Sequence, residues 1–293
     1  MAKVLRSKEG WLFELCIDTF LILLFLVFLI PLWRVLMVSL TPTPDANDPT
    51  LGLFPPPWKW ALISYKQFLS HPSFFKATYN SALILIGGVA VSLFLTVPLA
   101  YVLSIKDLPG RVFLSGLILV PFLFNPGLIP NYLTVTNLGL TDKLMAVFLP
   151  GAISVYNTYV MKSFFEGLPE ELKESARIDG ARELMILFRI ILPLSKPILL
   201  TIGLFYGVHF WNDFFSPLLY LNRQDLQPLP ILLRSILIAS NLNEYVEYDA
   251  YSSASVESLK SASVLIAALP MILAYPLIQK YFTKGTLVGS IKG

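Results

Sequence analysis

Charged residues and cysteine are scarce in this chain. Asp, Glu, Lys and Arg make up 14% of the 293 residues, whereas a soluble domain has about a quarter. Fifty-five per cent of the residues are hydrophobic, so the composition predicts a polytopic membrane protein with a single membrane domain, residues 1–293. Cys16 is the only cysteine, which excludes an intrachain disulfide. With just two histidines, His71 and His209, far apart, no metal site is expected.

Other absences narrow the function. The sequence has no GxxxxGK[ST] phosphate loop, so this chain cannot hold a nucleotide in that way. No Ser/His/Asp set or paired carboxylates are placed for catalysis, and we therefore expect neither an enzyme nor a cofactor. The formal charge is only +3 and basic residues occur singly, so nucleic acid is not expected as a partner.

Long apolar stretches dominate what is present. Six of them predict an all-α transmembrane helix bundle, and they lie at about 16–40, 81–105, 112–129, 144–161, 198–221 and 262–282. Six spans place both termini on one side of the membrane. About twice as many Lys and Arg residues fall on that side as on the other, which predicts that both termini are cytoplasmic. The first stretch lacks the short core and cleavage site of a signal peptide, so we expect an uncleaved span.

Two segments are polar. Residues 222–261 are expected to form an extracytoplasmic loop, and loops of this length are usually functional. A solvated cap over the bundle is the alternative. Residues 168–197 form a charged island, in which Pro169 suits the first turn of a helix and Gly180 can end that helix with a positive φ. Apolar residues at helical spacing follow as far as Pro193. This pattern predicts a cytoplasmic helix–turn–helix, which we call the elbow; a helix lying on the membrane surface is the alternative.

The elbow carries a recognisable motif. The run ESARIDGA at 174–181, followed by Ile190, Leu192 and Pro193, resembles the EAA loop of binding-protein-dependent ABC importer permeases. Ser175 stands where alanine is commonest, and both residues are small. The resemblance extends over nearly the whole chain to carbohydrate-importing permeases of the maltose-permease type, with its nearest likeness to the polysaccharide and aldouronate branch.

The resemblance implies a permease subunit of an ATP-driven importer in the bacterial inner membrane. Its implied partners are a homologous permease, two ATP-binding subunits that hydrolyse ATP, an extracytoplasmic solute-binding protein and the membrane lipid. The implied substrate is an oligosaccharide, with acidic ones such as alginate and aldouronate among the candidates. The residues implied to contact the ATPase are Glu174, Ala176, Asp179 and Gly180 in the elbow, and Gly289, Ser290 and Lys292 at the C-terminus.

A secondary sugar transporter driven by an ion gradient is the alternative function. Such a transporter is expected to have internal repeats and carboxylates within the membrane. No clear repeat is present, and Asp213 is the one convincing carboxylate.

The fifth stretch contains the candidate substrate path. Gly203 and Gly207 form a GxxxG pair, which is typical of close helix packing. The same stretch is unusually polar and aromatic for a lipid environment, and aromatic faces stack on sugars while amides and carboxylates bind hydroxyls. The candidate path residues are Tyr206, His209, Trp211, Asn212 and Asp213.

Helical spacing limits how many of them can face one cavity. Tyr206, His209 and Asp213 are expected to form a single stripe, since residues three and four apart are neighbours on a helix. Trp211 and Asn212 lie off this stripe. Tyr156 and Asn157 in the fourth stretch are a weaker case of the same kind. A hydrogen-bond network between helices, or aromatic residues near the external interface, is the alternative.

Overall fold

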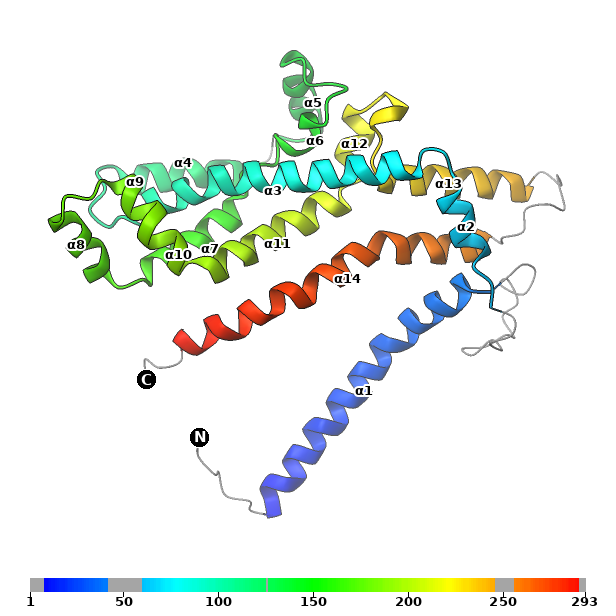
Figure 1. Cartoon of the computed structure of the whole chain (residues 1–293), viewed down its shortest axis with the longest axis horizontal. Helices are drawn as coiled ribbons and strands as arrows, with labels where there is room; N and C mark the ends of the chain where they lie inside the picture. Colours follow the sequence, from blue (N-terminus) through cyan, green and yellow to red (C-terminus); the bar gives the residue numbers. More distant parts are fainter. Residues whose placement is uncertain (1–7, 42–59, 125, 246–255, 290–293) are drawn as a thin grey trace. The chain divides into compact units, whose positions relative to one another are not determined.

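The computed structural model describes residues 8–41, 60–124, 126–245 and 256–289, and over these residues it is helical, without β-strands (Figure 1). It divides into two units. The first consists of Met1–His71 and Ser235–Ala268, and the second of Pro72–Arg234 and Leu269–Gly293. The second unit therefore carries the elbow and the candidate path.

The first unit joins its helices through small hydroxyl side chains. It contains α1 (Lys8–Ser39), α2 (Ile63–Leu69), the end of α13 (Leu229–Tyr245) and the start of α14 (Val256–Gly289). Ser258 Oγ is 2.7 Å from Ser64 Oγ and donates to Ser39 O at 3.3 Å. One buried hydroxyl thus connects α14 to both α1 and α2.

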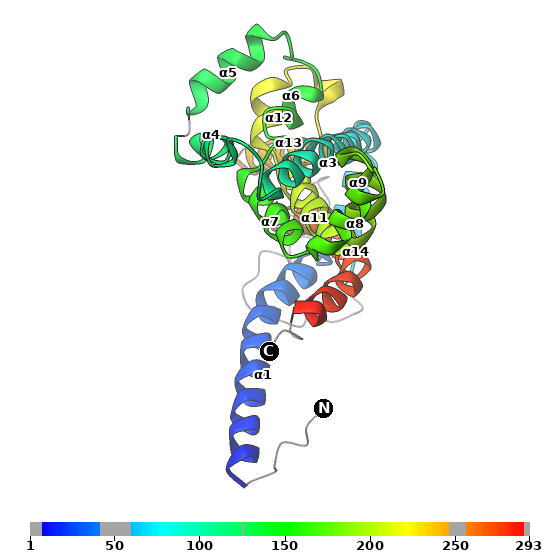
Figure 2. The same cartoon turned by 90° about the vertical axis from the view of Figure 1, so that its left-hand side faces the viewer.

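The second unit is built around three helices that pack on one another: α3 (Phe74–Ser104), α7 (Val155–Glu166) and α11 (Lys196–Asn212) (Figure 2). Glycines in α11 let it approach α3 closely. A Cβ added at Gly203 or at Gly207 would lie 3.6 Å from a leucine of α3. The GxxxG pair therefore has the packing role that was predicted for it.

Shorter helices complete this unit. They are α4 (Arg111–Leu123), α5 (Leu128–Asn137), α6 (Met145–Phe148), α8 (Glu170–Ile178), α9 (Glu183–Ile186), the π-helix η4 (Leu187–Ile191), α10 (Leu192–Leu194), α12 (Phe215–Tyr220) and the 3-10 turn η5 (Gln224–Leu226). α6 packs on α12, and both stand beside the main helices (Figure 1). The elbow follows α7, with α8, α9, η4 and α10 leading into α11.

Two helices of the described residues are long and apolar enough to cross a membrane, Phe13–Ser39 and Phe74–Ser104. Two bent pairs reach the same length and composition. Arg111–Leu123 with Leu128–Asn137 bends by 110°, and Glu183–Leu194 with Lys196–Asn212 bends by 85°. If each pair is one span, these residues hold up to four. The count of six and the side of the termini stay predictions.

Several helix boundaries differ from those expected. The link expected after the third stretch is helical as far as Asn137, in α5. The fourth stretch, expected at 144–161, is divided into α6 and α7, because a proline and a glycine separate them and Ser154 caps α7 by accepting from Asn157 N at 3.3 Å. The fifth stretch, expected at 198–221, ends earlier, since α11 stops at Asn212.

The C-terminal third is more helical than expected. Residues 222–261, expected as a loop, contain all of α13 and the first turn of α14. The apolar stretch 228–239 explains α13, because its leucines and isoleucines recur at helical spacing. α14 also continues to Gly289, although the last span was expected to end at about 282.

Candidate functional site

The elbow turns at Gly180. Its φ is +79°, as predicted, and the N–H of Gly180 donates to Arg177 O while the N–H of Ala181 donates to Ala176 O. These two bonds form a Schellman motif, which satisfies carbonyls that the end of a helix leaves unpaired. A Cβ at Gly180 would meet no atom within 4 Å, so the backbone conformation, not space, requires glycine here.

One narrow face of α8 is buried. Ala176 is 8% exposed and Lys173 is 2% exposed, whereas Leu172 and Ser175 are exposed. Lys173 can be buried because its long apolar stem packs while its ammonium lies 3.3 Å from Glu170 Oε2. The buried face of α8 therefore includes a lysine that sequence reasoning did not single out.

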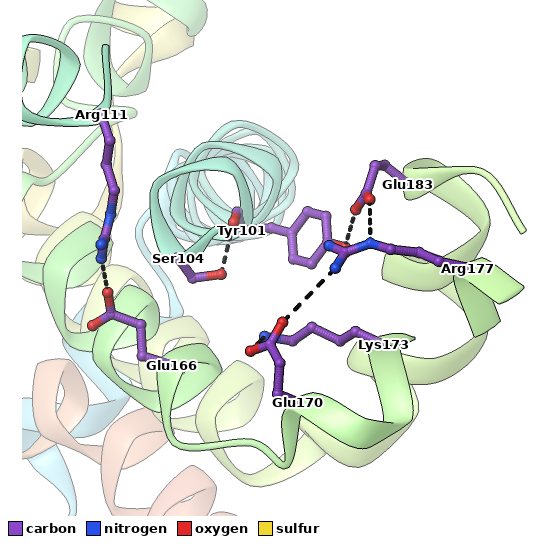
Figure 3. A network of polar contacts seen from close by, with 8 residues as sticks. All are labelled: Tyr101, Ser104, Arg111, Glu166, Glu170, Lys173, Arg177 and Glu183. Carbon is purple, nitrogen blue, oxygen red and sulfur yellow. Dashed lines mark hydrogen bonds and ion pairs between the residues drawn. The ribbon is translucent and has the colours of Figure 1, made fainter. Parts of the chain in front are cut away.

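A polar network connects the elbow with α3 (Figure 3). Tyr101 Oη donates to Glu183 Oε2 at 2.6 Å, and Arg177 Nε donates to Glu183 Oε1 at 2.9 Å. Arg177 also lies 3.9 Å from Glu170 Oε1. The hydrogen bond to Glu183 raises the pKa of Arg177, so the guanidinium remains charged.

The residues predicted to contact the ATPase differ in their exposure. Glu174, Asp179 and Gly180 are exposed, and Glu174 has no ion-pair partner among the described residues. Ala176 instead lies on the buried face of α8. At the C-terminus, Gly289 is the last residue of α14, while Ser290 and Lys292 lie outside the residues that the structure describes.

The second feature of this unit is a cavity of about 400 Å³ between α7 and α11. It is lined by Gly151, Ser154, Tyr156, Asn157, Phe205, Tyr206 and His209. Three aromatic rings, an imidazole and an amide thus surround one space, with no lysine, arginine or carboxylate among the lining residues. Such a surface can stack on an apolar face and hydrogen-bond to hydroxyl groups.

Tyr206 belongs to the cavity wall and to the helix packing at once. It is 1% exposed, its hydroxyl lies 2.8 Å from Thr96 Oγ1, and it accepts from Ser154 N at 2.9 Å. Its ring is stacked on Phe210, with 6.2 Å between centroids and 13° between planes. The hydroxyl therefore joins α3, α11 and the start of α7.

The structure brings together only part of the candidate path. Tyr206 and His209 line the cavity, but Trp211, Asn212 and Asp213 are not among its lining residues. Trp211 is 5% exposed, and Asn212 donates to Val208 O at 3.0 Å.

Asp213 lies at the end of α11 and does not line the cavity. Asp213 is the C-cap of α11, and its ψ of 112° turns the chain that follows it away from the helix. Asp213 Oδ1 instead accepts from Phe215 N at 3.0 Å and Ser216 N at 3.1 Å, at the start of α12. In this structure the carboxylate of Asp213 therefore caps α12, and its place in the substrate path stays a prediction.

Sequence reasoning missed part of the lining. Gly151, Ser154 and Phe205 were not proposed for the path. Ser154 could have been found as a helix N-cap, since serine is favoured there and caps sit at the ends of spans. No sequence signal marks Gly151 or Phe205. Tyr156 and Asn157, the weaker candidates, do line the cavity.

Comparison with known proteins identifies the family. Residues 1–288 match the family described as binding-protein-dependent transport system inner membrane component. Protein LplC of Bacillus subtilis is 39% identical over 290 residues, which cover 98% of this chain and 97% of LplC. The polygalacturonan/rhamnogalacturonan transport system permease protein YtcP of the same organism is 38% identical, over 96% of this chain and 99% of YtcP.

A solved structure is also similar. The crystal structure of a bacterial ABC transporter involved in the import of the acidic polysaccharide alginate matches with a TM-score of 0.85 and 28% identity, covering 96% of this chain and all of that one. The elbow motif, the helical bundle and the matched family agree. The chain belongs to the binding-protein-dependent transport system inner membrane components: it is a multi-pass permease, a transport subunit and not an enzyme.

Proposed function

We propose that this chain is one of two permease subunits in an ATP-driven importer of oligosaccharides. Its proposed partners are a homologous permease, two ATP-binding subunits and an extracytoplasmic solute-binding protein. It spans the membrane six times with both termini in the cytoplasm. ATP-driven closure of the ATPases moves the elbow, and the helices then expose the path to one side of the membrane and to the other in turn.

The elbow supports the coupling role. α8 presents Glu174 as an exposed carboxylate beside exposed apolar side chains, of which Ile178 is 85% exposed and Leu172 is 42% exposed. A surface that combines exposed apolar side chains with an unpaired carboxylate is suited to contact with a protein partner. In this proposal Glu174 pairs with a basic group of the ATPase, and Gly180 fixes the direction of the turn.

The cavity is the observation that carries the substrate path. Tyr156 and Phe205 are 61% and 40% exposed, so their rings are available for stacking on the C–H face of a sugar. Asn157 is 6% exposed, and its side-chain amide forms no hydrogen bond with the part of the chain that the structure describes, so it is available for hydroxyl groups. His209 is exposed at the same wall.

The relatives and this lining together support a proposal for the substrate class. Two of the similar proteins have names that specify polygalacturonan/rhamnogalacturonan and arabinooligosaccharides, and the similar structure imports alginate. We propose an acidic oligosaccharide, of the alginate or uronate type. His209 is the one lining side chain able to carry positive charge, so the partner permease supplies the other contacts with carboxylates.

Uptake by reconstituted vesicles tests this function. The complete complex with its binding protein should accumulate labelled uronate oligosaccharide only when ATP is present on the side of the membrane that corresponds to the cytoplasm. An ion gradient should make no difference. Uptake that follows an ion gradient and ignores ATP would contradict the proposal. A competition panel of acidic and neutral oligosaccharides of equal length then tests the substrate class, and stronger competition by the neutral set would overturn the acidic assignment.

A further inference from the structure

The elbow is joined to α3 by a route that does not follow the chain. Tyr101 lies in the last turn of α3, and its hydroxyl donates to Glu183 Oε2 at 2.6 Å. The other oxygen of the same carboxylate accepts from Arg177 of α8 at 2.9 Å. Figure 3 shows the Tyr101 ring extending from α3 to this pair. A single carboxylate thus holds α3 on one side and α8 on the other.

The phenol of Tyr101 is fixed in position. Tyr101 is 3% exposed, and its ring meets Phe165 of α7 edge to face, with 6.4 Å between centroids. A side chain confined in this way cannot follow Glu183 by rotating alone. If the elbow moves, either α3 moves with it or the hydrogen bond breaks.

The end of α3 is anchored on its other side as well. Arg111 Nε donates to Leu103 O at 2.9 Å, and its guanidinium pairs with Glu166 of α7. Lys162 lies 3.0 Å from the same carboxylate. The last turn of α3 is therefore held to α7. A displacement of Tyr101 is then transmitted to both helices, because the end of α3 cannot unwind freely.

We propose that Tyr101 is a positioning residue through which movement of the elbow is also transmitted to α3, so that the elbow has two outputs. The first output is the chain itself, which runs through α9, η4 and α10 into α11. The second is the side-chain link Arg177–Glu183–Tyr101. Because Thr96 of α3 contacts Tyr206 at the cavity wall, both outputs reach the same cavity. This inference rests on the proposed coupling function of the elbow.

A phenol deletion tests the link in the complete reconstituted complex. Tyr101→Phe removes only the hydroxyl, and Tyr159→Phe is its matched control, because Tyr159 also donates its phenol, to Ser115 O at 2.8 Å, without touching the elbow. Uptake and ATP hydrolysis are measured in the same vesicles. Tyr101→Phe should lower the sugar transported per ATP by about three- to tenfold, the range for one hydrogen bond of ordinary strength, because the Glu183 carboxylate is half exposed to water. Tyr159→Phe should leave this ratio unchanged.

A distance measurement gives a readout that does not depend on transport. Spin labels at Leu184 on α9 of the elbow and Phe94 on α3, both exposed, are introduced in a Cys16→Ser background. Their distance distribution should broaden in Tyr101→Phe and not in Tyr159→Phe. The proposal requires both the lower ratio and the broader distribution, and either result without the other overturns it.

Two further outcomes are distinguishable. If Tyr101→Phe does not assemble, Glu183→Ala removes the same link from its partly exposed end and carries the same test, with the same outcomes for and against. If the wild-type complex itself shows no ATP-driven uptake, the proposed function fails, and the role of Tyr101 in coupling fails with it; a lower ratio confined to the variant cannot be confused with that result.

Discussion

Two buried tyrosines hold the same helix by different chemistry. Tyr101 of α3 is 3% exposed and donates to Glu183, a carboxylate that is also paired with a guanidinium. Tyr206 of α11 is 1% exposed and meets a threonine hydroxyl and a backbone N–H, both neutral. The first phenol links α3 to the elbow, and the second links α3 to α11 and the start of α7.

The difference indicates which contact can change during transport. The side chains of Glu183 and Arg177 are 48% and 36% exposed, so water can replace the charged contact when the elbow moves. The neutral contact between Tyr206 and Thr96 is buried, and a polar group left there without a partner is costly. The elbow end is therefore suited to move and the cavity end to stay assembled.

The largest loss of stability is expected at the contact between α3 and α11, from a substitution of Gly88. A Cβ there would lie 2.6 Å from Phe210 Cδ2, and Phe210 cannot move aside because it is 3% exposed and stacked on Tyr206. Gly88→Ala should cost about 1–3 kcal/mol of stability through overpacking, and more if the helices separate. The melting temperature of the purified complex measures this.

The neighbouring glycine provides the control. At Gly87 a Cβ would be 3.6 Å from Phe148, an ordinary contact, so Gly87→Ala should be tolerated and gains up to about 1 kcal/mol in helix propensity. Equal melting temperatures for the two variants would contradict the close approach at Gly88.

In the elbow, a substitution that strains only the backbone should be enough to impair coupling. Gly180 has φ +79° in open space, so Gly180→Val should add about 1–3 kcal/mol of local strain without any clash. We expect membrane insertion to survive while ATPase co-purification and uptake fall. Gly180→Asn should retain more of both, since asparagine tolerates this conformation. Intact uptake in Gly180→Val would show that the turn is not the coupling element.

Two substitutions in the cavity wall should have different effects, one on stability and the other on transport. Tyr206→Phe leaves Ser154 N–H and Thr96 without their shared partner and should cost about 1–3 kcal/mol of stability. His209→Ala, on the exposed part of the wall, should keep the melting temperature and lower uptake by about three- to tenfold. Thermal unfolding and uptake are measured on both variants. A His209→Ala complex with normal uptake of the acidic oligosaccharide would remove His209 from the path.

Sequence reasoning anticipated features that depend on neighbours along the chain. The turn at Gly180 follows from local chemistry, because few residues other than glycine adopt a positive φ easily. The packing of Gly203 and Gly207 against α3 follows from their spacing on one helix face. The family was recognisable because its motif is continuous in the sequence.

Features that join distant segments were not predictable in this way. The Tyr101–Glu183 contact pairs residues 82 positions apart, and the hydroxyl of Tyr206 bonds to Thr96, 110 positions away. Neither pair has a periodic pattern, since each depends on how the helices pack. The end of α11 was also missed, because hydrophobicity continues into α12 and hides the break at Asp213.

Asp213 gives the smallest expected effect and the clearest test of that break. Its carboxylate accepts from two N–H groups at the start of α12 and is not among the residues that line the cavity. Asp213→Ala should cost about 0.5–2 kcal/mol, as the loss of a helix cap does, with uptake per assembled complex unchanged. Asp213→Asn should restore most of the stability because its amide oxygen can accept the same bonds. If instead both variants keep the melting temperature and abolish uptake, the carboxylate itself takes part in transport, as expected for a residue of the candidate substrate path.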